Sequence, residues 1–139
     1  MNLPTSQPPL HQPVPAFPTI PTNLPPVVYV AGPYRAPDNW QIEANVRRAE
    51  TLALEVWRLG AAAICPHANT RFYQGAAPDD VWLIGDLAML KKCDAILMTP
   101  DWAKSMGATA ERDFAVDHGI PVFYAIQDLE IWIQDNRLP

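Results

Sequence analysis

The sequence has few cysteines, no long apolar run and a minority of basic residues. Cys65 and Cys93 are the two cysteines, and their separation matches no metal-binding spacing. No apolar run approaches the roughly 18 residues of a membrane-spanning helix, and the first residues carry neither a Lys or Arg nor an apolar stretch typical of a secretory signal. With 10 Lys and Arg against 15 Asp and Glu, the formal net charge is −5. We therefore expect a reduced, cytoplasmic protein with no nucleic-acid or membrane partner.

Charged residues are also missing from residues 1–26, where nine of the sixteen prolines stand. Proline lacks an amide donor and fixes φ, so this segment can form neither a helix nor a central strand. We expect a polyproline-type arm over residues 1–26, either a loose tail or a strap that packs Phe17 or Ile20 on a neighbouring subunit. The folded domain is then residues 27–139, because a chain of 139 residues that is 49% hydrophobic is typical of one globular domain.

Short apolar runs alternate with segments of helical periodicity after the arm. Continuous apolar runs predict buried strands, and apolar residues three or four apart predict helices. The expected strands are 27–31, 61–65, 94–99 and 121–124; the expected helices are 39–59, 78–92, 106–118 and 128–134, with a long polar loop over 66–77. This alternation predicts an α/β fold, a flavodoxin- or Rossmann-like doubly wound parallel sheet of four or five strands in the order 2-1-3-4.

Ligands of such sheets bind beyond the carboxyl ends of the strands. The first loop there contains no G-x-G-x-x-G or G-x-x-x-x-G-K phosphate-binding pattern. In it, Gly32 allows a sharp turn, Tyr34 is suited to stack on a flat ligand, and Arg35 is suited to hold an anion. An ordinary strand-ending turn remains the alternative. The second loop is rich in hydrogen-bonding groups, including His67 and Asn69, but a lone His without a second ligand at metal spacing predicts no metal site.

The third loop leads into a helix whose first amides have no intrahelical acceptor. Ser105 and Gly107 stand at this helix start, which is suited to bind an anion. One turn later, Glu111 lies near the positive end of the helix dipole, so we expect it to stay ionised. An ionised, positioned carboxylate is what a nucleophile at a sugar carbon requires. A Glu that only favours the first helical turn remains the alternative.

Four motifs together resemble the nucleoside 2-deoxyribosyltransferase superfamily, which includes nucleoside 5′-monophosphate N-glycosidases and small domains of unknown function. They are V-Y-V-A-G-P-Y-R, D-L-A-M-L-K-K-C-D-A-I-L, W-A-K-S-M-G-A-T-A-E-R-D-F-A and G-I-P-V-F-Y, spread over residues 27–124. The resemblance implies that Glu111 is the nucleophile, that Asp86 assists the leaving base, and that Tyr29 orients the nucleophile. It also implies a substrate-binding role for the first loop. The expected substrate-binding residues are Gly32, Pro33, Tyr34, Arg35, His67, Asn69, Trp102, Ser105 and Gly107.

The resemblance implies a double displacement at the anomeric carbon of a nucleoside, without a metal or redox cofactor. A free base or a water would resolve the glycosyl ester, so transfer between bases and hydrolysis of a 5′-monophosphate are both open. Ser105 stands where some transferases carry Asp and the monophosphate hydrolases carry Ser, which leaves the acceptor undecided. A nucleotide-binding module without turnover is a third possibility. The family also implies a homodimer or a higher homo-oligomer whose small-molecule partners are a nucleoside or nucleotide and a free base.

Overall fold

The computed structural model describes residues 19–136 and contains one parallel sheet of four strands. The strands are β1 (Val27–Ala31), β2 (Ala62–Ile64), β3 (Ala95–Met98) and β4 (Val122–Phe123). Their order is β2-β1-β3-β4, and every neighbouring pair is parallel. Parallel neighbours require crossover helices, so the alternating sequence pattern correctly predicted both the doubly wound α/β fold and the strand order.

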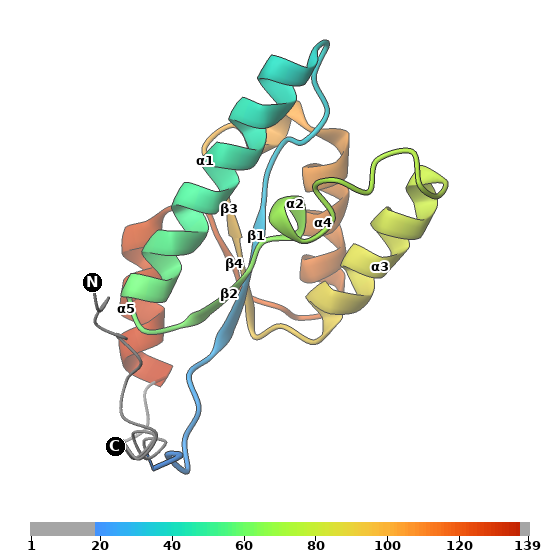
Figure 1. Ribbon diagram of the computed structural model, residues 1–139. Coiled ribbons are helices and arrows are strands. Elements are labelled where there is room, and N and C mark those ends of the chain that lie inside the picture. The colour runs from blue at the N-terminus through green and yellow to red at the C-terminus, as the bar shows by residue number, and fades with distance from the viewer. Residues whose placement is uncertain (1–18, 137–139) are drawn as a thin grey trace, which may run out of the picture.

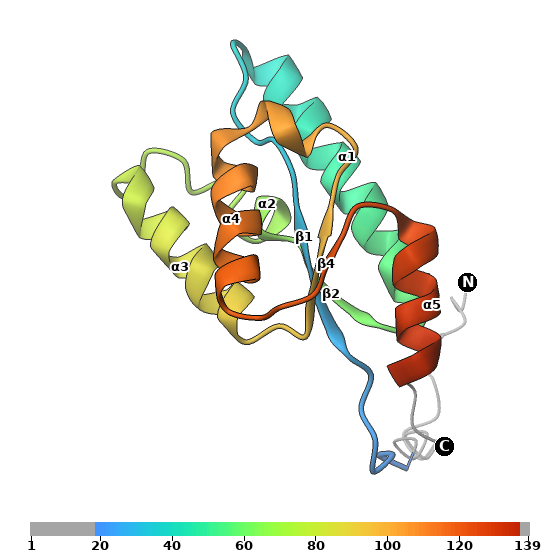
Figure 2. The same cartoon turned by 180° about the vertical axis from the view of Figure 1, so that it is seen from behind.

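Helices cover both faces of the sheet (Figures 1 and 2). The long α1 (Asn39–Arg58) and the terminal α5 (Ile126–Asn136) lie on one face, and α3 (Asp79–Lys91) and α4 (Met106–Asp117) lie on the other. The start of α1 is set by Asp38, whose carboxylate accepts a hydrogen bond from the Gln41 amide at 2.8 Å. The predicted helices therefore all form, with ends that differ by one or two residues from the expected ones.

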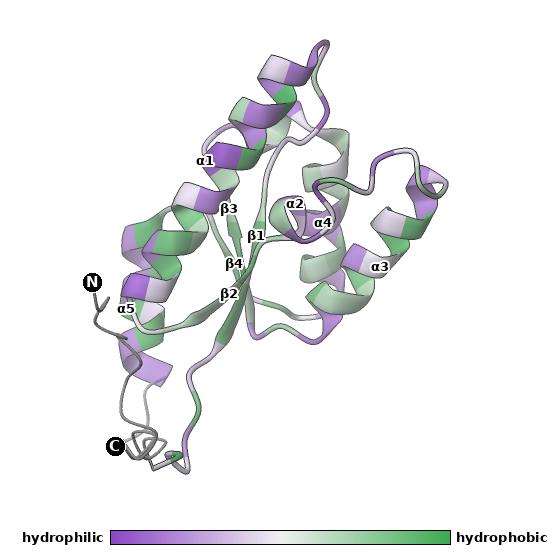
Figure 3. Ribbon diagram, viewed as in Figure 1, coloured by the Kyte–Doolittle hydropathy of each residue, from purple (hydrophilic) through white to green (hydrophobic). Residues whose placement is uncertain are grey.

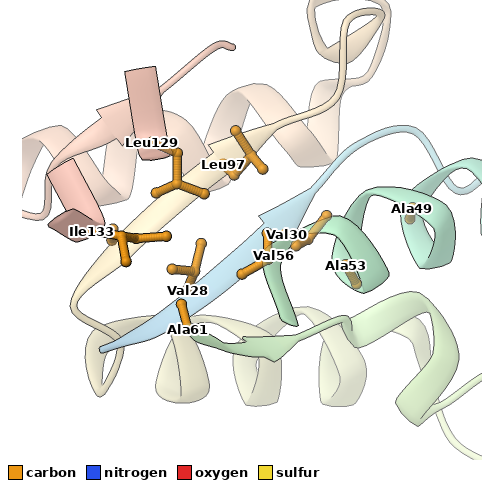
Figure 4. Packing of buried hydrophobic residues seen from close by; sticks show 10 residues of the cluster. Val28, Val30, Ala49, Ala53, Val56, Ala61, Leu97, Leu129 and Ile133 are labelled. Carbon is orange, nitrogen blue, oxygen red and sulfur yellow. The ribbon is translucent and has the colours of Figure 1, made fainter. Parts of the chain in front are cut away.

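The residues of β1 alternate between two cores. Val28 and Val30 point toward α1 and α5 and pack in the cluster shown in Figure 4. Tyr29 and Ala31 point the opposite way, into a second cluster formed with α3 and α4. Because β1 is buried on both faces, it reads as an uninterrupted apolar run. Figure 3 shows hydrophobic colour along the central strands, whereas α1 and α5 alternate between hydrophobic and hydrophilic colour.

The region expected to be one long polar loop contains a short helix, α2 (Pro66–Asn69). Proline suits the first helical position because its missing amide would have had no acceptor there. The amides of Ala68 and Asn69 both donate to the Cys65 carbonyl, at 3.1 and 3.2 Å. A second single turn, η1 (Trp102–Lys104), lies in the loop after β3. Both elements are a single turn long, and helical periodicity can be recognised in a sequence only over several turns.

The N-terminal segment contains no helix or strand between residue 19 and Pro26. Ile20 is 76% exposed there, so it is not buried against the described part of the domain. The rest of the expected arm, including Phe17, lies outside the described residues. None of the helices found between residues 19 and 136 is both long enough and apolar enough to cross a membrane.

Candidate active site

A cleft of about 500 Å³ opens at the carboxyl edge of the sheet. The loop after β1, the turn of α2, the first half of α3 and the start of α4 form its walls, so four separate segments converge on it. This is the position at which doubly wound sheets bind their ligands. The lining residues are Gly32, Pro33, Tyr34, Arg35, Pro66, His67, Thr70, Gln74, Asp79, Trp82, Leu83, Asp86, Lys104, Ser105, Met106, Gly107, Ala108 and Glu111.

The loop after β1 is held in place by close packing at its first residue. Gly32 has an ordinary backbone conformation, since the positive φ values in residues 19–136 belong to other glycines. A Cβ at Gly32 would overlap the Thr99 hydroxyl and methyl groups at the end of β3. The glycine is therefore required by this close approach between two strand ends, and the expected sharp turn is not the reason.

Polar contacts fix the remainder of that loop. The buried His67 ring donates from Nε2 to the Pro33 carbonyl at 2.9 Å, and its edge contacts the Tyr34 ring at a centroid distance of 5.5 Å. Burial lowers the pKa of His67, so the ring is neutral with its proton on Nε2. The Asn45 amide of α1 donates to the Tyr34 carbonyl at 3.0 Å. His67 thus contributes to the cleft mainly by shaping its wall.

Arg35 extends across the cleft mouth and pairs with Asp79 at the start of α3. Asp79 also accepts a hydrogen bond from the Gln74 amide at 2.9 Å, and these two donors lower the pKa of its carboxyl, Gln74 contributing more. Both members of the ion pair are well exposed, so the pair adds little to stability. It does leave the Arg35 guanidinium at the rim, where an anionic ligand could compete with Asp79 for it.

The start of α4 presents backbone donors to the cleft. The Ser105 hydroxyl caps the helix by accepting from the Ala108 amide at 3.1 Å, and the Ser105 carbonyl accepts from the Thr109 amide at 3.0 Å. The first amides of a helix have no intrahelical acceptor, and Met106 and Gly107, which carry two of them, line the cleft. An anion site around Ser105 and Gly107 stays a prediction.

Two carboxyl groups from different helices share this cleft. Glu111 lies one turn into α4 and Asp86 lies in the middle of α3. Burial raises the pKa of Glu111 to about 7; the Tyr29 hydroxyl opposes this rise, and the charge of Asp86 adds to it. Burial alone raises the pKa of Asp86 to about 6. Desolvation thus opposes the effect of the helix dipole on Glu111, and the expectation that Glu111 stays ionised remains a prediction.

Tyr29 lies beneath the two carboxyl groups, fully buried in β1. Burial, followed by the charges of Glu111 and Asp86, raises its pKa far above the ordinary value, so its hydroxyl stays protonated and can donate. No hydrogen-bond partner lies within bonding geometry of this hydroxyl among the described residues. The hydroxyl is close enough to lower the pKa of Glu111, and catalytic hydrogen bonds often tighten only when substrate is bound. Its position fits a donor that orients Glu111.

Most of the residues singled out in the sequence meet in this cleft, and three do not line it. Tyr29 lies under the cleft floor rather than in its lining. The Asn69 amide is exposed and faces the Met89 sulfur at 3.9 Å, outside the cleft. Trp102 packs against the Tyr124 ring at 5.5 Å, so it supports α4 from behind and does not line the cleft. Asn69 and Trp102 were expected to bind substrate because they share a loop with true lining residues, but neighbours on a loop can point in opposite directions.

Trp82 is the most informative lining residue that the sequence analysis missed. It lies in the first turn of α3, its ring contacts Tyr73 at 5.8 Å, and its indole Nε1 is buried without a partner in residues 19–136. A buried unpaired donor at a cleft wall is a candidate contact for a ligand. The sequence shows that this residue is aromatic. Because α3 is apolar on several sides, the sequence does not show which way the Trp82 side chain points. Lys104 stands in the third motif, next to Ser105, but the sequence analysis gave it no role in binding.

The described part of the chain, residues 19–136, has no group of three or more His, Cys, Asp or Glu side chains placed to hold a metal ion.

Comparison with solved structures relates this fold to an enzyme. The chain superposes on the 2-deoxyribosyltransferase of the psychrotolerant bacterium Bacillus psychrosaccharolyticus with a TM-score of 0.51 and 21% sequence identity. The match covers 69% of this chain and 69% of that one. That enzyme is described as a suitable biocatalyst for the synthesis of antiviral and antitumoral nucleosides. At this level of identity the likeness shows a common fold. No curated protein sequence matches the chain.

A family model gives the more extensive match. The model of DUF4406, a domain of unknown function, covers residues 26–124, which include every strand and every cleft-lining residue named above. The match begins at the last proline before β1 and ends just after β4. The chain therefore belongs to the DUF4406 family.

Proposed function

We propose that this protein cleaves the N-glycosidic bond of (deoxy)nucleosides through a glycosyl ester on Glu111 and transfers the sugar to another base. One observation carries the proposal: two carboxyl groups with raised pKa values, Glu111 and Asp86, enter one cleft from different helices above a buried tyrosine hydroxyl. The fold shared with a 2-deoxyribosyltransferase supports it. This pairing of carboxyls suits the chemistry, because glycosyl transfer needs one ionised group and one protonated group at the same bond.

In the first step, a Glu111 carboxylate oxygen attacks C1′ of the sugar as the bond from C1′ to the base nitrogen breaks. The electron pair of that bond goes to the base, which takes a proton from Asp86. The charge of Asp86 raises the pKa of Glu111, so the pair shares a single proton more readily than it carries two charges. In the reactive form the single proton lies on Asp86 and Glu111 is ionised, although the higher pKa of Glu111 favours the opposite placement in the empty cleft. The Tyr29 hydroxyl orients the attacking carboxylate.

In the second step, a nitrogen of an incoming base attacks C1′ and Glu111 leaves as a carboxylate. Asp86, now ionised, accepts the proton that the incoming base loses, which returns the site to its starting state. If water attacks C1′ instead, Asp86 accepts a proton from that water. The products are then a free sugar and the same singly protonated pair of carboxyl groups. Trp82 and Tyr34 offer aromatic faces at the cleft wall, where a purine or pyrimidine ring could stack.

A second candidate function is hydrolysis of a nucleoside 5′-monophosphate. It is favoured by the cap of α4, where the Ser105 hydroxyl and the Met106 and Gly107 amides face the cleft close to Lys104. A phosphate carries nearly two negative charges, and hydroxyl, amide and ammonium donors are its usual partners. The transferase remains the first choice, by a small margin.

A direct experiment separates these candidates. The protein is incubated with a panel of nucleosides and their 5′-monophosphates, with and without a second free base, and the products are separated by chromatography. A new nucleoside that forms only with added base supports transfer. Exclusive cleavage of the monophosphate without any exchange product contradicts transfer and supports the hydrolase. Tight nucleotide binding without any turnover would instead indicate a non-catalytic binding module.

The Ser105→Asp variant sharpens the same comparison. In a monophosphate hydrolase, the new carboxylate would repel the phosphate and raise KM for the monophosphate far more than for the nucleoside. In a transferase, the variant would be tolerated with nucleosides. Ser105→Ala serves as the matched control, since it removes the α4 cap without adding charge and should cost about 1 kcal/mol of stability.

We also propose that the protein acts as a homodimer or a higher homo-oligomer, with α3 at the contact. Val81, Leu83 and Ile84 of this helix are 49%, 49% and 65% exposed, an unusual concentration of apolar surface beside the cleft. Light scattering of the wild type and of Ile84→Glu tests this: a wild-type oligomer that dissociates in the variant is expected, and a monomeric wild type refutes it.

We further propose a cytoplasmic location and a domain boundary near residue 26. The two free thiols support the first, and the start of the family match supports the second.

A further inference from the structure

A second cavity of about 450 Å³ adjoins the cleft on the α1 side of the loop after β1. It shares Pro33, Arg35 and Lys104 with the cleft, so the two spaces meet along one wall. Its own lining comes from the first three turns of α1 and from the loop after β3, including Trp40 and Arg48. Neither carboxyl group of the candidate active site lines it, so the chemistry described above does not use this second cavity.

Positive charge gathers in the second cavity although the chain carries a net charge of −5. Arg35, Arg48 and Lys104 line it, and Asp101 is the carboxylate among them. Asp101 lies 3.8 Å from the Arg48 guanidinium, which also donates to the Asn45 side chain. The Lys104 ammonium has no ion-pair or hydrogen-bond partner among residues 19–136. Arg35 is paired with Asp79 outside this cavity, so three cations face two carboxylates, and the positive charge that remains indicates an anionic ligand.

Trp40 gives the second cavity an aromatic wall. It is 84% exposed in the first turn of α1, an unusual position for the largest apolar side chain. Its ring makes no contact with another aromatic ring in the described part of the chain. An exposed tryptophan beside arginines is suited to stack on a flat ring that an anionic ligand carries.

The shared residues indicate how one ligand would occupy both spaces. Lys104 lines both spaces, and Met106 and Gly107, whose amides begin α4, line the cleft together with it. A phosphate bound at those amides would therefore lie next to the passage into the second cavity. A further phosphate in the same chain would meet Arg35 at the rim and Arg48 beyond it.

We propose that the second cavity binds the phosphate chain of a nucleoside that carries two or more phosphates at its 5′ end. The nucleoside part of this inference rests on the proposed function of the cleft. Two ligands share the required chemistry, a nucleoside 5′-di- or triphosphate and a dinucleoside pyrophosphate. In the second of these, Trp40 would stack on the distal ring.

Inorganic anions test the second cavity without reference to any reaction. Calorimetry measures the binding of phosphate, pyrophosphate and tripolyphosphate to the wild type, with affinity expected to rise along that series. Arg48→Gln should weaken tripolyphosphate binding about tenfold, the usual value of a charge-assisted contact. Arg47→Gln is the matched control, since it is the adjacent α1 residue, is similarly exposed and lines neither space. Equal affinity for the three anions, or equal losses in both variants, overturns the proposal.

Nucleotides then test the connection between the two spaces. Binding of one 2′-deoxynucleoside and its mono-, di- and triphosphate is compared in the wild type, Arg48→Gln and Arg47→Gln, together with release of the free base. The expected result is a preference for the di- or triphosphate over the monophosphate that Arg48→Gln reduces about tenfold. A preference for the monophosphate overturns the extended ligand even where its base is released. Absence of base release from every compound refutes the proposed function, while the binding series still decides the inference.

The last comparison decides which of the two ligand classes supplies the phosphate chain. Trp40→Ala is tested against tripolyphosphate and a dinucleoside pyrophosphate. Selective loss of the dinucleoside pyrophosphate assigns the distal ring to Trp40, and equal binding in the variant assigns the cavity to nucleoside 5′-di- or triphosphates. If the variant loses affinity for tripolyphosphate and for the dinucleoside pyrophosphate to the same extent, the assignment of Trp40 as a stacking residue is overturned.

Discussion

Replacement of Glu111 by Gln should abolish turnover and at the same time stabilise the protein above neutral pH. Gln keeps the size of the side chain and removes its charge. Loss of a covalent nucleophile reduces rates by several orders of magnitude, far beyond the roughly 0.3–1 kcal/mol that a charge near a helix terminus contributes. The stability effect has the opposite sign, because ionised Glu111 is desolvated in the folded protein and solvated in the unfolded chain.

The size and pH window of this stabilisation follow from the pKa of Glu111. Folding raises that pKa from 4.5 to about 7. Below pH 4.5 the group is protonated in both states and costs nothing; as pH rises from 4.5 to 7 the unfolded chain ionises first, so the folded state loses stability. Above pH 7 the full cost is present. Each tenfold change in proton affinity corresponds to about 1.4 kcal/mol of stability. For the pKa shift of Glu111, reduced for its partial exposure, the cost to the folded state is roughly 2–3 kcal/mol at pH 8.

Chemical denaturation at pH 4, 6 and 8 measures the effect. The variant should match the wild type at pH 4, exceed it at pH 6 by roughly half of the full difference, and at pH 8 exceed it by an amount that corresponds to a rise in Tm of roughly 5–10 °C. Glu130→Gln, at an exposed site on α5, is the control and should change stability little at any pH. A variant as stable as the wild type at pH 8, or one that keeps more than about a tenth of the activity, would refute the assignment of Glu111.

Three further predictions concern the neighbouring residues. Asp86→Asn should slow the release of poor leaving bases by about 10²–10⁴-fold and of activated ones much less, so equal slowing across a series of bases would indicate a purely structural role. The pH profile of kcat/KM should be bell-shaped with flanks near pH 6 and 7, because full protonation of Asp86 and Glu111 removes the nucleophile and full ionisation removes the acid; a profile flat from pH 5 to 8 would contradict the shared proton. Gly32→Ala should destabilise the protein by about 2 kcal/mol or more through overlap with Thr99, and Thr99→Ala should restore part of that loss in thermal unfolding; an unchanged Tm would contradict the close approach.

Several features of the candidate site could be predicted from short-range sequence patterns. The start of α4 is one, since a serine before a helical segment specifies a cap and free amides without reference to the rest of the chain. The position of Glu111 one turn later follows from the same helix. Helical periodicity likewise located Asp86 within α3. In each case the property depends on residues fewer than five positions apart.

Properties that depend on which way a side chain points could not be predicted from those patterns. Trp102 and Asn69 belong to loops that border the cleft, yet one packs behind α4 and the other faces solvent. Trp82 and Lys104 line the cleft without standing out in the sequence. Loop residues have no fixed periodicity, so only the packing of the whole domain decides their orientation.

The sequence by itself determined the fold of this protein, because alternating apolar runs and helical periods leave few ways to bury every strand on both faces. The observed order β2-β1-β3-β4 is the flavodoxin-like order expected for such a sheet, whereas the right-handed crossovers fix only on which face each helix lies. The tertiary structure alone decided the ionisation of Glu111, since the pKa of a carboxyl depends on the burial that distant segments impose. It also decided that Arg48 and Lys104, far apart in the chain, line one cavity, because a contact between separate elements has no local signal in a sequence.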